Sequence, residues 1–136
     1  MLNKLVWDEK YSVGVLIIDS QHKEMFKTIN ELIETLEGMP TKEQVDKILE
    51  ALIAYKKFHF ATEEKYFAEF GYEGSADHMT KHREFSEKLE SLIVESKGDS
   101  VALAFTLVDF LEDWLIDHLM VVDQKYVECF KTHGLT

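Results

Sequence analysis

Hydrophobic residues recur every three or four positions in four separate stretches of this chain. Such spacing places apolar side chains along one face of an α-helix. The stretches cover about residues 19–37, 41–70, 75–97 and 100–131, with short connections between them. Helices joined by short connections are usually antiparallel neighbours. The sequence therefore predicts an all-α fold, an up-down-up-down antiparallel four-helix bundle, with an extended N-terminal arm over about residues 1–18.

Local signals indicate where these helices begin and end. Asp19 is predicted to cap the first helix, which Gly38-Met39-Pro40 ends. Thr41 and Gln44 have the spacing of a capping box at the start of the second helix. Ser75 is predicted to cap the third helix after a short break with two glycines.

Composition narrows the class of protein. The 136 residues suit one domain with one core, and 46% of them are hydrophobic. The formal charge of −11 argues against nucleic acid, whose phosphates would be repelled. The first twenty residues lack the pattern of a signal peptide, and their longest apolar run is too short to span a bilayer. We expect a cytoplasmic protein with no membrane insertion. Cys129 is the only cysteine, so no internal disulfide can form.

Histidine and carboxylate pairs four residues apart are the most informative pattern. His59 and Glu63 share one face of the second predicted helix, and His78 and His82 share one face of the third. The break around residues 70–75 makes these two helices antiparallel neighbours. Three imidazoles and one carboxylate are therefore expected to meet near one end of a helical hairpin.

The first and fourth predicted helices add three further residues at the same end. His22 lies near the start of the first helix and thus beside the end of the second. His118 and Asp123 lie well along the fourth helix, which runs back toward that end. At about 1.5 Å of rise per residue, five histidines and two carboxylates fall in one layer of the bundle.

Two interpretations of this convergence compete. A lone histidine on an apolar helix face is usually a hydrogen-bonded core residue, and a single pair at this spacing more often binds nothing. Burying five imidazoles and two carboxylates without a cation would be strongly unfavourable, which favours a metal site. Seven ligands are too many for one tetrahedral zinc and suit two ions that share carboxylates. We expect two irons bridged by Glu63 and Asp123, and the nitrogen-rich set favours ligand binding over substrate oxidation.

The complete set resembles the ligand pattern of the hemerythrins, in particular the bacterial branch. The pattern reads His22, His59-x-x-x-Glu63, His78-x-x-x-His82 and His118-x-x-x-x-Asp123. The resemblance covers essentially the whole chain and is strengthened by Trp7, Val13-Gly14-Val15 and Asp19-Ser20-Gln21. It implies a single hemerythrin-like domain over residues 1–136, with a non-haem di-iron centre that binds O2 reversibly.

The same resemblance divides the ligands between two iron ions (Fe2+ or Fe3+), which also share an oxo or hydroxo group. His78, His82 and His118 would hold one iron, which is coordinatively full. His22 and His59 would hold the other iron and leave a position open for O2.

Four residues are implied to surround the O2 site. Leu115 lies three residues before His118 on the same helix face and is similar to the family's residue that covers bound O2. Trp114, Phe60 and Tyr126 are the expected neighbouring aromatics, although each alone is better explained as a core residue. Their role would be to shape the pocket and exclude water.

The spacing of His118 and Asp123 predicts an irregular helix. Five residues along a regular α-helix leave two side chains about 140° apart. Both can reach the metals only if the helix is locally widened, as in a π-bulge. Outer partners should orient the histidines through their second ring nitrogen, but the sequence does not identify them.

The expected function is O2 binding for storage, transport, delivery or scavenging, in a protein that is not primarily an enzyme. O2 is the expected ligand, an oxidase or oxygenase would receive it, and a monomer is expected. The alternatives are a di-iron redox enzyme of the peroxidase or nitric-oxide reductase type and an O2 or redox sensor. Iron storage or transfer is a third class.

Overall fold

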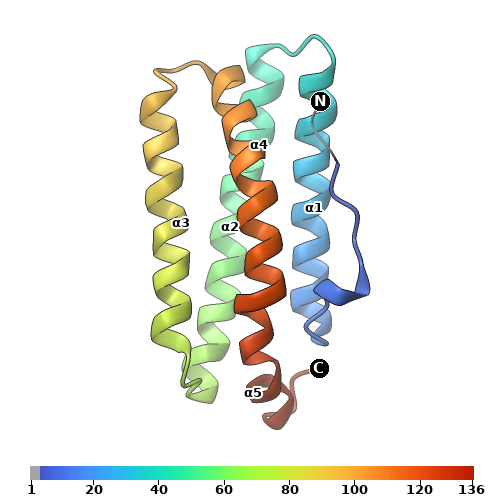
Figure 1. Cartoon of the computed structure of the whole chain (residues 1–136), viewed down its shortest axis with the longest axis vertical. Helices are drawn as coiled ribbons and strands as arrows, with labels where there is room; N and C mark the ends of the chain where they lie inside the picture. The colour runs from blue at the N-terminus through green and yellow to red at the C-terminus, as the bar shows by residue number, and fades with distance from the viewer. Residues whose placement is uncertain (1–3) are drawn as a thin grey trace.

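Four long helices pack side by side in the computed structural model, which describes residues 4–136 (Figure 1). They are α1 (Leu16–Glu37), α2 (Lys42–Phe70), α3 (Ser75–Glu95) and α4 (Ser100–Asp117). The chain continues from α4 through a π-helix η2 (His118–Val122), a 3₁₀-helix η3 (Asp123–Tyr126) and α5 (Val127–Thr132). No strand occurs within the described residues. The predicted up-down-up-down four-helix bundle is confirmed.

The ends of α2 follow the predicted local signals. Thr41 accepts a hydrogen bond from the Gln44 backbone N–H, and the Gln44 side chain accepts one from the Thr41 N–H. This reciprocal pair satisfies backbone donors that the first turn of a helix leaves free. Gly71 ends α2 at φ 59°, a left-handed conformation that glycine adopts without steric cost.

Three predicted boundaries were wrong. The start of α1 and the end of α3 differ from the prediction by three and two residues, and the cap of α3 is a different residue. α1 begins at Leu16, because the Asp19 carboxylate accepts hydrogen bonds from the arm that precedes the helix. Gly74, not Ser75, precedes the first residue of α3, and the Ser75 hydroxyl is directed at the Met79 sulfur. α3 ends at Glu95, because the chain soon turns through residues 97 and 98, both with positive φ.

The N-terminal arm lies along α1, as Figure 1 shows. Leu5 and Asn30 exchange two hydrogen bonds of 2.7 and 2.8 Å, and the Trp7 ring packs edge-on against Phe26. The arm contains a single 3₁₀ turn, η1 (Glu9–Tyr11). Residues 1–3 of the predicted arm lie outside the described residues.

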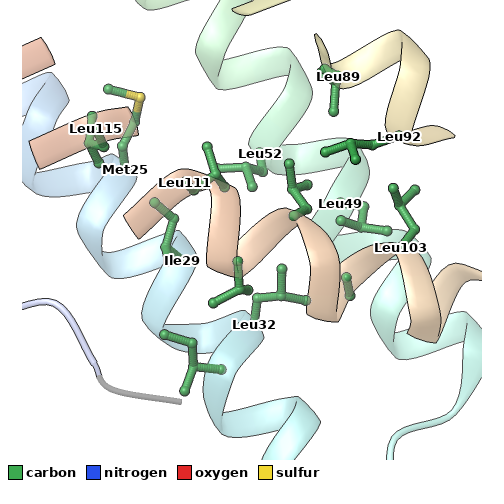
Figure 2. Packing of buried hydrophobic residues seen from close by; sticks show 14 of the residues in the cluster. Met25, Ile29, Leu32, Leu49, Leu52, Leu89, Leu92, Leu103, Leu111 and Leu115 are labelled. Atoms are coloured by element: carbon green, nitrogen blue, oxygen red, sulfur yellow. The ribbon is translucent and has the colours of Figure 1, made fainter. Parts of the chain in front are cut away.

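Two clusters of buried apolar side chains fill the bundle. The larger cluster involves all four long helices and includes Met25, Leu52, Leu89 and Leu111, which are among the side chains drawn in Figure 2. The smaller cluster lies toward the end of the bundle where α2 is connected to α3. It consists of Val13, Val15, Ile18, Phe67, Tyr126 and Phe130.

A polar layer separates the two clusters. On α1, His22 lies between Ile18 of the smaller cluster and Met25 of the larger one. On α2, Glu63 lies between Phe67 and Phe60 in the same way. The packing therefore encloses this layer in apolar surroundings from both ends. No helix within residues 4–136 is long and apolar enough to cross a membrane.

Candidate metal centre

Seven polar side chains from four segments of the bundle meet in this layer. All are buried, with exposed fractions of 4% or less. They are His22 from α1, His59 and Glu63 from α2, His78 and His82 from α3, and His118 and Asp123 from the segment after α4. The structure thus brings together every residue that the sequence predicted as a metal ligand.

The first of two groups consists of His22, His59, Glu63 and Asp123, whose ligand atoms lie within 4.8 Å of one another. The Nε2 atoms of His22 and His59 are 3.1 Å apart. His22 Nε2 is 3.2 Å from Asp123 Oδ2, and His59 Nε2 is 3.3 Å from Glu63 Oε1. A cation among these atoms could contact two imidazoles and two carboxylates.

The second group consists of Glu63, His78, His82 and His118. His82 Nε2 lies 3.1 Å from Glu63 Oε1. Asp123 borders this group too, because its Oδ1 is 2.9 Å from His118 Nε2 and 3.1 Å from His78 Nε2. Glu63 belongs to both groups, and Asp123 directs one oxygen toward each. The arrangement therefore has the donor set of two neighbouring cation sites that share carboxylates.

Several of these atoms have no hydrogen-bond partner among residues 4–136. They are the Nε2 atoms of His78 and His118, Glu63 Oε2 and both carboxylate oxygens of Asp123. Buried polar atoms are rarely left unpaired in folded proteins, and an unpaired buried charge is strongly unfavourable. Metal ions among the imidazole nitrogens and carboxylate oxygens would satisfy all of them. The residues present thus fit a dinuclear metal centre.

Electrostatics keep both carboxylates ionised in the metal-free protein. Burial raises the pKa of Glu63, but the facing imidazoles, led by His59, outweigh burial and hold this pKa well below its usual range. Burial and the Glu63 charge raise the pKa of Asp123, yet its imidazole neighbours, led by His118, hold it far below normal. Two buried carboxylates that stay charged can attract cations without first losing a proton.

The π-helix brings His118 and Asp123 into this layer together. The Asp123 N–H donates to the His118 carbonyl, a hydrogen bond across five residues rather than four. This wider turn compensates for the five-residue spacing, which would direct the two side chains apart on a regular α-helix. The predicted local widening of the helix is confirmed.

Two partners of the histidines were not identified from the sequence. His59 Nδ1 lies 2.7 Å from Gln21 Oε1, and Gln21 in turn donates to the Thr62 hydroxyl. His82 Nδ1 lies 2.7 Å from Glu64 Oε2. In the sequence, Gln21 directly precedes His22, and Glu64 directly follows Glu63. That adjacency was the available signal, since a residue beside a ligand flanks the same site. Such contacts fix the ring orientation and direct Nε2 toward the metal.

The four predicted O2-pocket residues do not all lie together. Leu115, Trp114 and Phe60 line one apolar cavity of about 20 Å³, beside Met25. A space of this size holds about one water-sized molecule. Tyr126 belongs to the smaller apolar cluster instead, with its ring 5.6 Å from the His78 ring.

Aromatic rings also cover the outer faces of two histidines. The Phe60 ring stacks on the His82 ring at a centroid distance of 3.7 Å, and the Trp114 ring stacks on the His118 ring at 4.3 Å. Each contact covers one face of the imidazole ring. The fold and the site together define a class of protein: four-helix bundles that enclose a nitrogen-rich cluster of side chains able to hold metal ions.

The sequence comparisons identify the family within this class. Residues 13–130 match the family model described as the hemerythrin HHE cation binding domain. The chain is 30% identical to a bacteriohemerythrin of Clostridium acetobutylicum over 127 residues, which cover 90% of this chain and 98% of the relative. It is 31% identical to the myohemerythrin of Riftia pachyptila, with 89% of each chain covered. The chain belongs to the hemerythrin family.

Solved structures agree with this assignment. A wild-type hemerythrin crystal structure superposes with a TM-score of 0.84 at 27% sequence identity, covering 93% of this chain and 98% of the other. The family is known for binding O2 at a non-haem di-iron centre, and its members are generally O2-binding proteins rather than enzymes.

Proposed function

We propose that this protein binds O2 reversibly at a non-haem di-iron centre and is not primarily an enzyme. The observation that carries the proposal is the inequality of the two ligand groups. Three histidines surround one site, and only His22 and His59 face the other. With Glu63 and Asp123 shared, the two-histidine site has one protein ligand fewer and leaves room for a small exogenous ligand.

The chain's own residues suit this task in three ways. Glu63 and Asp123 lie between the groups and would hold the irons together. Gln21 and Glu64 orient His59 and His82 through their Nδ1 atoms. When bound, the two ferrous ions supply the electrons for holding O2.

The surroundings favour binding over turnover. The cavity lined by Leu115, Trp114 and Phe60 is apolar, and the two apolar clusters exclude water from both ends of the polar layer. A dry site slows the proton-assisted loss of reduced oxygen that would oxidise the irons irreversibly. We also propose that residues 1–136 form a single hemerythrin-like domain, supported by the family match over residues 13–130.

Metal analysis combined with absorption spectra tests the proposal. The protein is loaded anaerobically with ferrous iron, exposed to air and then purged. We expect two irons per chain and a visible charge-transfer band that appears in air and fades on purging. His22→Ala should lose this reversible band, whereas His133→Ala should keep it, because His133 is exposed and outside both groups.

Other outcomes point to the alternatives. Two irons with immediate, irreversible oxidation and sustained turnover of peroxide or nitric oxide would indicate a redox enzyme. Loosely bound iron of variable stoichiometry would indicate iron storage or transfer. Zinc or no metal in the purified protein would contradict the di-iron assignment.

A further inference from the structure

A surface groove of about 700 Å³ lies between α2 and α3, which are neighbours in the bundle (Figure 1). Its volume falls within the range of small-molecule sites. Three cationic side chains line it, namely Lys56, Lys57 and Arg83, against one carboxylate, Glu64. The whole chain has 26 acidic and 15 basic residues. The groove therefore reverses the sign of the charge that prevails over the rest of the protein.

Lys56 is the most unusual of these cations. Only 8% of it is exposed, although lysine is almost never buried without a partner of opposite charge. Its Nζ donates to the Ser86 hydroxyl at 3.1 Å and lies 5.5 and 5.6 Å from the ring centroids of Phe60 and Phe85. No carboxylate of residues 4–136 forms an ion pair with it. Its contacts among residues 4–136 are thus a neutral hydroxyl and two ring faces, which leave the ammonium available to an anion in the groove.

The neighbouring charges increase the deficit. Burial lowers the pKa of Lys56, and the Lys57 charge lowers it further, while Glu90 only partly opposes them. Glu64, the one acidic residue in the groove, is already hydrogen bonded to His82 Nδ1. An anion in the groove would supply the missing negative charge.

The remaining lining indicates what kind of anion fits. Arg83 donates to the Thr80 hydroxyl at 3.1 Å, and no carboxylate among the described residues pairs with its guanidinium. Apolar atoms of Phe60, Met79 and two alanines form another part of the wall. Cations and hydroxyls beside an apolar surface match a molecule with a charged end and an apolar body.

We propose that the groove between α2 and α3 binds a small organic carboxylate, whose charged end lies at Lys56 and Ser86 and whose apolar body packs against Phe60 and Met79. Two wall residues contact a candidate iron ligand: Phe60 stacks on the His82 ring, and Glu64 is hydrogen bonded to it. An occupant therefore also alters O2 affinity. This second part rests on the proposed O2 function.

Titration calorimetry of the iron-loaded protein with benzoate tests the binding site. We expect saturable binding of one benzoate per chain, and at least tenfold weaker binding of benzyl alcohol, which has the same ring without the charge. Lys56→Met should weaken benzoate binding at least tenfold, whereas Lys56→Arg should retain it. Lys47→Met, an exposed change on the same helix, is the matched control and should have no effect. Absence of saturable binding, or equal binding by Lys56→Met, would overturn the proposal.

O2 titrations with and without benzoate test the coupling. The half-saturation pressure of the wild-type protein should shift on benzoate binding, and that of Lys56→Met should not, because linked binding free energies are reciprocal. An unchanged pressure at saturating benzoate would overturn the coupling. Benzoate binding in a protein that fails to bind O2 reversibly would instead contradict the proposed function and leave the groove site standing.

Discussion

Glu64→Gln should weaken metal binding in one ligand group and spare the other. The substitution keeps the hydrogen bond to His82 Nδ1 but removes its charge. A charge-assisted hydrogen bond contributes about 1.5–3 kcal/mol, against about 1 kcal/mol for a neutral one. The difference is about 0.5–2 kcal/mol. The Glu64 side chain is 32% exposed, so solvent screening favours the lower half of this range. We expect a loss of about 1 kcal/mol, or ~fivefold in affinity for the ion at the three-histidine group.

Anaerobic competition with a ferrous-iron chelator measures this effect, and we expect the two inequivalent ions to be released in separate phases. The phase of the three-histidine group should shift in Glu64→Gln. Gln21→Ala should shift the other phase, since Gln21 contacts His59. Glu69→Gln is the matched control, an exposed change on the same helix. An equal shift of both phases in Glu64→Gln, or no shift in either, would refute the assignment of Glu64 as an orienting partner of His82.

Two further results are expected. Deleting the exposed Val121 should convert the π-helix into a regular α-helix in which His118 and Asp123 are four residues apart and still share one face, so metal analysis should still give about two irons per chain; a clear loss of iron would contradict this. In the metal-free protein, burial lowers the pKa of His78, but the facing carboxylates of Asp123 and Glu63 raise it to about 9. Metal must displace this proton, so apparent affinity should rise with pH up to about 9. The pKa of His78 is higher in the folded than in the unfolded state, so its protonation stabilises the folded metal-free protein. This contribution is complete below pH ~6.5 and is lost as the pH rises through about 9. Calorimetry in buffers of different ionisation enthalpy measures the protons released on metal binding. Thermal melts at different pH values measure the stability of the metal-free protein.

The sequence was sufficient for the bundle, because helical periodicity and short connections restrict four amphipathic helices to very few arrangements. It was also sufficient to bring His22, His59 and His118 to one layer, since rise per residue converts sequence position into height. The widened turn followed from the same arithmetic, because a regular helix cannot direct His118 and Asp123 the same way. These predictions all depend on regular geometry.

The residues that the sequence did not reveal depend on side-chain conformation instead. Gln21 and Glu64 contact histidines of other helices, and no spacing rule specifies such pairs. The start of α1 was missed for a related reason. Asp19 has the residue type of a helix cap, but its carboxylate bonds to the arm, a contact that only the folded chain creates. Tyr126, which the resemblance places near O2, packs with Phe67 in the smaller apolar cluster, with its ring 5.6 Å from the His78 ring.

The smaller apolar cluster has a consequence for the order of folding. It joins Val13 and Val15 near one end of the chain to Phe130 near the other, with Phe67 from the middle. Contacts between such distant residues close long loops, and the entropic cost of closure favours their formation after the local contacts within the helices. The polar layer is complete only when this cluster has closed beneath it, since Asp123 belongs to the same terminal segment as Phe130. Iron would therefore bind after the chain has folded. Its binding would lower the rate of unfolding and leave the rate of folding unchanged.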